Sequence, residues 1–267
     1  MNTPVRVVLF YILTFIFTII LGGTQQVLGI GNWIILPQLS PGLAALIMMA
    51  SFRKDNVKPT ISVKRAQTLK YIVAVGVPLF VSVVLFLIYR QFIGQLSIPS
   101  LSVISALILF VGLLIGAFGE ELGWRGYLQP VLEGKANVLL ASLVVGVLWG
   151  VWHVGNYQYG AVYMSFFVLS TIAYSVVVAW LLRGTSYNVV IALLFHFVVN
   201  TGFFMLTNAL TDLQFMMLNG ILWGIVAAIL VMLKREDFCP PGRKMLGGQS
   251  STGRDVFDKN GYLLFIN

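Results

Sequence analysis

The sequence predicts an all-α protein, a polytopic membrane helix bundle of about eight transmembrane helices. The first observation is composition: of 267 residues, 58% are hydrophobic and only 10% are charged, and the mean hydropathy is +0.92. Soluble domains carry about 25% charged residues, so a soluble fold could not bury this much apolar surface and lipid must solvate much of the chain. The second observation is that the apolar residues form long stretches, and the third is that cations gather between alternate stretches.

A spanning helix needs about 20 mostly apolar residues, and eight stretches are candidates. They are roughly 5–23, 31–52, 70–89, 99–119 (continuing to about 132), 137–154, 160–182, 187–209 and 214–233. In the second stretch, Pro37 and Pro41 predict a kink or a late helix start. The first stretch has the character of a signal peptide, but no small-x-small cleavage site follows it, so we expect an uncleaved span.

The positions of the cations predict the orientation of these helices. With eight spans, 16 of the 17 Lys and Arg residues fall on one side of the bilayer, and only Arg90 falls on the other. The positive-inside rule then places both termini in the cytoplasm, and the compact chain suggests a bacterial plasma membrane. Loops that face anionic lipid also account for the net charge of +8, so no nucleic-acid partner is expected.

The chain is expected to consist of one membrane domain and a tail. Residues 1–233 form the predicted membrane-embedded domain, whose polar motifs lie between about 99 and 209. The polar, Gly-rich stretch 234–267 is expected to be a cytoplasmic C-terminal tail. Because Cys239 is the single cysteine, the sequence excludes an internal disulfide framework and a CxxC metal site.

Two acids and both histidines fall in the apolar portion of the chain, at Glu120, Glu121, His153 and His196. Ionisable residues at membrane depth are costly, so they indicate function by default. If the fourth helix runs to about 132, then Glu120, His153 and His196 lie about 18, 24 and 15 Å from their cytoplasmic turns. These depths are close enough for one shared site, provided that the polar stretch 120–129 stays helical and faces a protein cavity.

Helical spacing separates the roles of the two glutamates. Glu121 and Arg125 are four residues apart and can pair on one helix face. This pairing leaves Glu120, about 100° around the helix, to point elsewhere. We therefore expect a structural ion pair for Glu121 and Arg125.

The same spacing adds two further residues to the histidines. His196 and Asn200 are four residues apart, so both can face one cavity. Trp149 precedes His153 by four residues and is expected to be a wall of the site or a packing residue.

These residues form three motifs. Residues 120–125 fit EExxxR, 149–153 fit aromatic-xxx-H, and 196–200 fit HxxxN. In this order and on eight spans, the chain resembles the CPBP family of intramembrane proteases, also called the CAAX prenyl protease 2 (Rce1-like) or Abi family, over roughly 30–210. Each motif alone is weak, but the three together are specific because they use both histidines and both buried acids. Trp149 stands where the family more often has Phe, and it keeps an aromatic ring.

The resemblance implies an intramembrane endopeptidase, a hydrolase that acts on peptide or protein substrates at the lipid bilayer. By position, Glu120, His153, His196 and Asn200 match the catalytic residues of the family, and Glu121, Arg125 and Trp149 match supporting positions. A buried Glu beside a His can take a proton from water, and His196 and Asn200 can donate hydrogen bonds to a developing oxyanion.

The resemblance leaves the metal and the substrate open. Glu120, His153 and His196 are a plausible Zn²⁺ set with an open fourth position, so a zinc-assisted metalloprotease and a metal-free glutamate mechanism are both expected possibilities. Eukaryotic members of the family remove the last three residues of prenylated CAAX proteins. Other relatives are linked to bacteriocin immunity and peptide maturation, which is the more natural setting for a bacterial chain.

Two other classes of function remain as alternatives. One is a non-catalytic bacteriocin-immunity or interaction protein that keeps the site without using it. The other is a small proton-coupled transporter, in which Glu120 and the histidines relay protons and Pro37 and Pro41 mark a broken helix. No internal repeat supports the transporter. Other protease classes lack their motifs, because Val154 rules out HExxH and 184–187 do not fit GxSxG.

Overall fold

The computed structural model describes residues 2–29, 35–52, 57–94, 100–204 and 211–239, together with the backbone of 255–257 and 263–265. The first half contains α1 (Thr3–Val27), a 3₁₀ turn (Leu36–Leu39) leading into α2 (Ser40–Ser51), α3 (Thr68–Phe92), and α4 (Val103–Gly123). The second half contains a π turn (Trp124–Leu128), α5 (Gln129–Glu133), α6 (Val138–Trp152), α7 (Ala161–Leu181), α8 (Val189–Phe204), α9 (Leu213–Leu233) and α10 (Arg235–Phe238).

The predicted polytopic helix bundle is confirmed, and apolar helices lie at all eight predicted positions. Five of them are long and apolar enough to cross a membrane, at Thr3–Val27, Arg65–Phe92, Val103–Glu133, Ala161–Leu181 and Leu213–Leu233. The other three are shorter, at Leu36–Ser51, Val138–Trp152 and Val189–Phe204. The described part of the second span starts late, as its two prolines predict. In the tail, β1 (Asp255–Phe257) pairs antiparallel with β2 (Leu263–Phe265).

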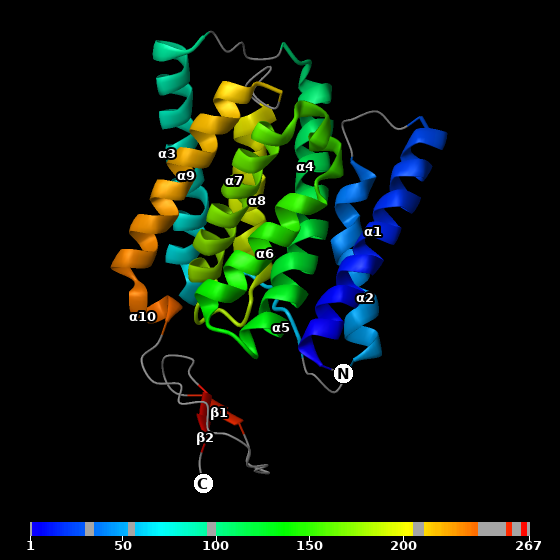
Figure 1. Ribbon diagram of the computed structural model, residues 1–267, viewed down its shortest axis with the longest axis vertical. Helices are drawn as coiled ribbons and strands as arrows, with labels where there is room; N and C mark the ends of the chain where they lie inside the picture. Colours follow the sequence, from blue (N-terminus) through cyan, green and yellow to red (C-terminus); the bar gives the residue numbers. More distant parts are fainter. Residues whose placement is uncertain are drawn as a thin grey trace.

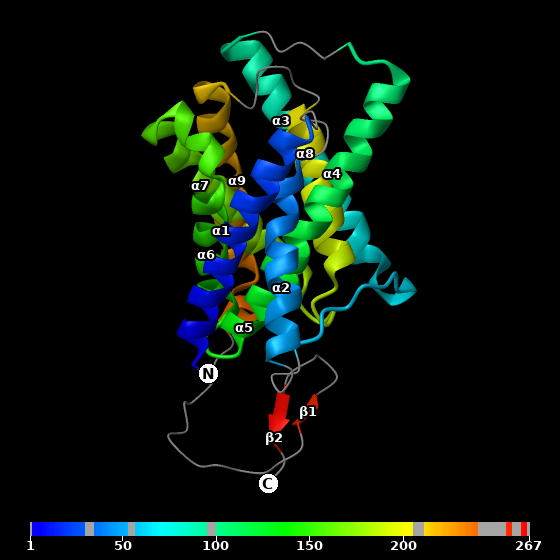
Figure 2. The same cartoon turned by 90° about the vertical axis from the view of Figure 1, so that its right-hand side faces the viewer.

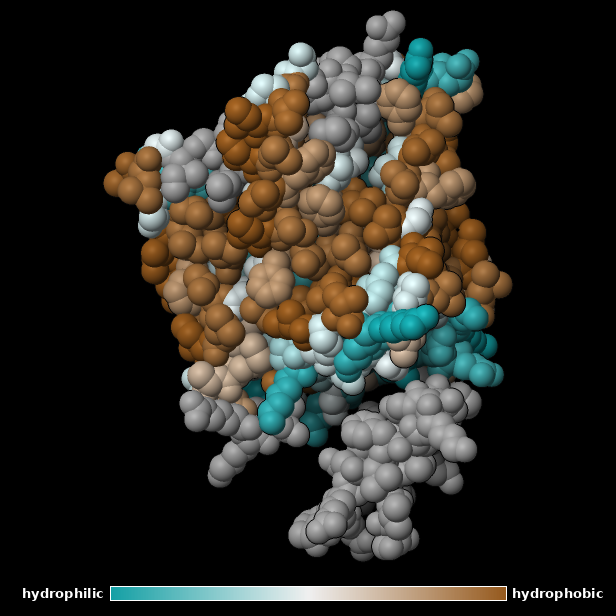
Figure 3. Space-filling view, turned by 180° about the vertical axis from the view of Figure 1, so that it is seen from behind, coloured by the Kyte–Doolittle hydropathy of each residue, from teal (hydrophilic) through white to brown (hydrophobic). Residues whose placement is uncertain are grey.

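The helices run up and down, so that α1 begins and α9 ends at the same end of the bundle (Figures 1 and 2). Exposed cations, including Lys64, Arg65, Lys135 and Lys234, belong to this end. Figure 3 shows apolar residues covering the flank of the bundle and hydrophilic residues gathered at its lower end. This surface suits a multi-pass membrane protein, in which lipid covers the apolar flank.

The fourth span continues through the polar stretch, as the sequence argument requires. All residues from Gly119 to Gln129 are buried, and helical structure runs on to Glu133 by way of the π turn. Single π turns within helices occur frequently at functional sites. The 16 cations that the sequence places on one side of the bilayer include Arg125, and this assignment needs correction, because Arg125 is only 1% exposed and lies inside this helical segment.

Glycines allow α2 to approach α4 closely. A Cβ atom added at Gly42 would lie 2.8 Å from the carbonyl oxygen of Gly119, and one added at Gly119 would lie 2.8 Å from the Cα of Leu39. Small residues of this kind let helix backbones touch within a membrane. The close contact places the 3₁₀ turn that begins α2 directly against the middle of α4.

Candidate active site

Glu120 is completely buried on α4, and both of its carboxylate oxygens accept hydrogen bonds. The side-chain amide Nε2 of Gln38 donates to Oε1 at 2.9 Å, and the indole Nε1 of Trp149 donates to Oε2 at 2.6 Å. The two donors come from the start of α2 and from α6. The carboxylate is thus held between two other elements of the bundle.

Trp149 is the residue around which the predicted site residues gather. Its ring centroid lies 5.1 Å from that of His196 and 6.0 Å from that of His153. The guanidinium carbon of Arg125 lies 4.3 Å from the centre of the same ring. Trp149 is therefore both the expected wall and a hydrogen-bond donor to Glu120, which the sequence did not reveal.

His153 is partly exposed and follows the last residue of α6. Its Nδ1 lies 2.8 Å from the carbonyl oxygen of Trp149. Because a carbonyl oxygen only accepts, Nδ1 must carry the proton, and a neutral His153 presents a lone pair on Nε2. The rings of Trp152 and Phe167 pack at 4.9 and 4.8 Å and fix the orientation of the imidazole.

Glu121 connects Arg125 to His196. Its Oε1 accepts from a guanidinium nitrogen of Arg125 and from Nδ1 of His196, each at 2.8 Å, so the predicted ion pair is present. Arg125 also donates to the Oγ of Ser175 on α7 at 3.0 Å. The other oxygen of Glu121 is buried without a hydrogen-bond partner in the described part of the chain.

Asn200 lies one helical turn beyond His196 on α8 and is partly exposed. Within the described ranges its amide makes no hydrogen bond, so the group remains available to a substrate. The structure thus gathers Glu120, His153 and His196 around Trp149, and it leaves Asn200 nearby on the helix that carries His196.

Two contributors escaped the sequence argument, Gln38 and Ser175. Gln38 bonds to a residue 82 positions away, and Ser175 to one 50 positions away. Helical spacing reveals only partners within one helix, so neither contact could be read from it. One signal was present for Gln38, because it is the single Gln inside the second apolar stretch.

The zinc expectation finds no support in this geometry. In the portion of the chain that the structure describes, no three His, Cys, Asp or Glu side chains are grouped so that they could hold a metal ion. Both oxygens of Glu120 already accept N–H groups, and these bonds compete with a metal. Among the described residues, the Nε2 atoms of His153 and His196 have no hydrogen-bond partner, since each ring is held through Nδ1.

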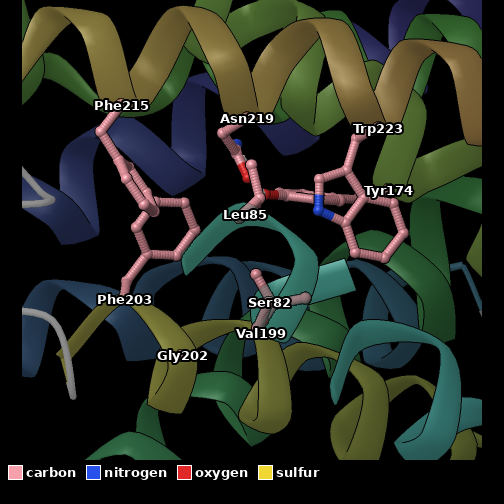
Figure 4. Close-up of a pocket in the computed structure, with 9 residues that line it drawn as sticks. All are labelled: Ser82, Leu85, Tyr174, Val199, Gly202, Phe203, Phe215, Asn219 and Trp223. Carbon is pink, nitrogen blue, oxygen red and sulfur yellow. Dashed lines mark hydrogen bonds between the residues drawn. The ribbon is translucent and has the colours of Figure 1, made fainter. Parts of the chain in front are cut away.

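A second buried polar cluster lies between α7 and α9. Asn219 donates through Nδ2 to Ser170 Oγ at 2.8 Å and to Tyr174 Oη at 3.0 Å. Beside it is a cavity of about 10 Å³ (Figure 4). Its lining residues are Ser82, Leu85, Tyr174, Val199, Gly202, Phe203, Phe215, Asn219 and Trp223. A cavity of this size is comparable to one water molecule and cannot admit a peptide.

The polar motifs lie within a stretch that matches a known family. Residues 102–202, from the start of α4 into α8, match the family described as type II CAAX prenyl endopeptidase Rce1-like. This stretch resembles an Rce1-like domain. It contains Glu120, His153, His196 and Asn200, whereas Gln38 lies before it. The match confirms the predicted resemblance.

Similar proteins carry two different names. The chain is 29% identical to lysostaphin resistance protein A of Staphylococcus haemolyticus over 85% of its length, and it spans 65% of that protein. It is 28% identical to CAAX prenyl protease 2 of Methanococcus maripaludis, covering 86% of this chain and 95% of that protein. Lysostaphin resistance protein A of Staphylococcus epidermidis is also 28% identical, with 97% of this chain and 69% of that protein covered.

Proposed function

We propose that this protein is an intramembrane endopeptidase that hydrolyses peptide bonds of membrane-associated substrates with water activated at Glu120. The observation that carries the proposal is the gathering of Glu120, His153 and His196 around Trp149, inside the Rce1-like domain. Burial supports it, because a carboxylate excluded from bulk water can act on a single bound water molecule.

In the proposed reaction, Glu120 takes one proton from the water molecule. The Nε2 lone pair of His153 accepts a hydrogen bond from the other O–H of the same water. The hydroxide attacks the carbonyl carbon of the substrate, and the peptide C–N bond then breaks. The proton held by Glu120 passes to the leaving amine, which restores the carboxylate. Positioned general acid–base groups contribute about 10²–10⁴-fold to such reactions.

His196 and Asn200 are suited to stabilise the oxyanion that forms in this step. Nδ1 of His196 is held by Glu121, so the ring can donate from Nε2 only when it is doubly protonated. The Asn200 amide offers a neutral donor one turn away, and two donors aimed at one oxyanion are a common arrangement in acyl transfer.

We propose further that the substrate is a peptide or protein segment delivered within the membrane, and that prenylation is not required. Support for this breadth comes from the names of the relatives, of which one refers to a CAAX prenyl protease and others to lysostaphin resistance. A bacterial plasma membrane with both termini cytoplasmic fits the cation distribution of the sequence.

The test is hydrolysis of two labelled peptides by the full chain in detergent, one farnesylated CAAX peptide and one unmodified transmembrane peptide. Glu120→Gln should lower the rate by at least about 10²–10⁴-fold, because Gln cannot accept the proton. Glu133→Gln is the matched control, since Glu133 lies at the basic end, where it bonds Gln129 and Tyr187 and is 3.9 Å from Arg183, and it should keep wild-type activity. Equal activity of Glu120→Gln and wild type would contradict the proposal.

The same samples distinguish the metal-free mechanism from the zinc-assisted one. They also test the two alternative functions, an interaction protein and a transporter. Metal content is measured on wild type, His153→Ala and His196→Ala, before and after a chelator. Activity that survives the chelator supports the metal-free mechanism, whereas stoichiometric zinc lost together with activity in the variants supports a metallopeptidase. Wild type without hydrolysis of either peptide favours an interaction protein, and proton-coupled flux in vesicles favours a transporter.

A further inference from the structure

We propose that Gln38 is a positioning residue that orients the Glu120 carboxylate for catalysis from outside the Rce1-like domain. The inference rests on the proposed function, since it assigns Gln38 a part in that reaction. Gln38 lies in the 3₁₀ turn at the start of α2 and is partly buried. Its Nε2 donates to Glu120 Oε1 at 2.9 Å.

The backbone around Gln38 is built to place this one amide. Gly116 on α4 leaves the space for it, because a Cβ atom at residue 116 would overlap the side-chain amide oxygen of Gln38. One turn further along, Gly119 lets the backbone of Gln38 and Leu39 touch α4. The segment is also tied to α1, since the backbone N–H of Leu36 donates to Gln25 Oε1 at 2.8 Å.

The donors of the two neighbouring glutamates differ in charge. Glu121 bonds to the cation Arg125 and to His196. Glu120 bonds to a neutral amide and a neutral indole. A hydrogen bond from a neutral group fixes a carboxylate without pairing it directly with a cation. Because Gln38 and Trp149 approach different oxygens from different helices, together they define the plane of the carboxylate.

The first test compares Gln38→Met with wild type. The Met side chain has nearly the length of Gln and offers no N–H. It should lower kcat about tenfold to a hundredfold with KM unchanged, because one hydrogen bond to a charged group is worth roughly that factor. If shape alone mattered, Gln38→Met would keep the wild-type kcat, and the inference would be overturned.

The second test displaces the amide without changing Gln38. Gly116→Ala places a methyl group where the flexible end of Gln38 now lies, so the amide must leave Glu120. The same fall in kcat is expected as for Gln38→Met. Gly76→Ala is the matched control, because nothing lies within 4 Å of its added Cβ on α3, and it should retain wild-type kcat. A wild-type kcat for Gly116→Ala would count against the inference.

A third measurement does not depend on activity. Thermal unfolding in detergent is measured for Gln38→Met, Glu120→Gln and the double variant. If Gln38 bonds Glu120 directly, the losses of melting temperature in the two single variants should not add in the double variant. Additive losses would mean that the two side chains pack independently, and they would overturn the inference.

Failure of the inference can be told from failure of the function. If Glu120→Gln is inactive but Gln38→Met keeps the wild-type kcat, only the role of Gln38 is lost. If Glu120→Gln remains fully active, the proposed function is lost and this inference with it.

Discussion

The helix α7 contributes adjacent residues to two buried polar clusters of opposite character. Ser175 belongs to a charged cluster with Arg125, Glu121 and His196. Tyr174 belongs to an uncharged cluster, with Asn219 on α9 and Ser170. Both clusters are buried among apolar helices, so they differ mainly in charge and in how many of their hydrogen-bonding groups have partners. Comparing them shows how these two properties affect stability and function.

The uncharged cluster is saturated. The Asn219 amide donates to both hydroxyl groups, its oxygen accepts from Tyr174, and the Ser170 hydroxyl donates to the carbonyl of Phe166 at 2.8 Å. The charged cluster is not saturated, since one oxygen of Glu121 has no partner among the described residues and Nε2 of His196 is open. Saturated neutral groups hold helices together, whereas unsatisfied ionisable groups mark a place where something else binds.

The largest effect on stability is expected from breaking the charged cluster. Arg125→Met should lower the free energy of unfolding by about 3–5 kcal/mol, because it leaves Glu121 buried beside His196 without its cation. Thermal or denaturant unfolding in detergent measures the loss. Arg183→Met is the control, since Arg183 is partly exposed, lies 3.9 Å from Glu133 and should cost less than about 1 kcal/mol. Equal stability of the two variants would mean that the buried ion pair of Arg125 contributes no more to stability than the peripheral one of Arg183.

A smaller effect is expected from the uncharged cluster. Asn219→Leu keeps the volume but removes the amide, and it should lower the free energy of unfolding by about 1–2 kcal/mol. Because the cluster holds helices and takes no part in the proposed chemistry, peptide hydrolysis per folded molecule should not change. A selective loss of activity in folded Asn219→Leu would show that the two clusters are not functionally separate.

The smallest effect is expected for a single bond outside either cluster. Trp152 Nε1 donates to Thr18 Oγ1 at 2.8 Å and joins α6 to α1. Thr18→Val preserves the shape and removes this bond between helices, together with the bond that Thr18 Oγ1 donates to the Thr14 carbonyl oxygen within α1, so the free energy of unfolding should fall by roughly 0.6 kcal/mol. The same unfolding assay detects this loss, and a value equal to that of Asn219→Leu would mean that the cluster adds nothing beyond its separate bonds.

The helices and the contacts within one helix could be predicted from the sequence. Apolar length gave the eight helical positions, and the four-residue spacing gave the Glu121–Arg125 pair. Both are local properties, fixed by helix geometry and by lipid as solvent. The continuation of the fourth helix to about residue 132 was predicted because only then does Glu120 lie at the same membrane depth as His153 and His196.

Contacts between helices could not be predicted in the same way. The bonds from Gln38 and Trp149 to Glu120, and from His196 to Glu121, join residues 82, 29 and 75 positions apart. These bonds depend on which helices are neighbours and on how closely their backbones approach. The hydrophobic periodicity of the sequence predicts neither property. The π turn is equally invisible, because it arises from local strain and packing and not from the hydrophobic pattern.

The glycine contact between α2 and α4 has a mechanical consequence. With Gly42 and Gly119 in backbone contact, no layer of side chains remains that could yield if one helix slid along the other. These two helices must therefore move as a rigid unit, carrying Gln38 and Glu120 together. Lateral admission of a peptide then requires displacement of a more loosely held neighbour. Among the five candidate spans in the described residues, α1 has the least buried apolar window, 11%, so it is the span held by the least packing.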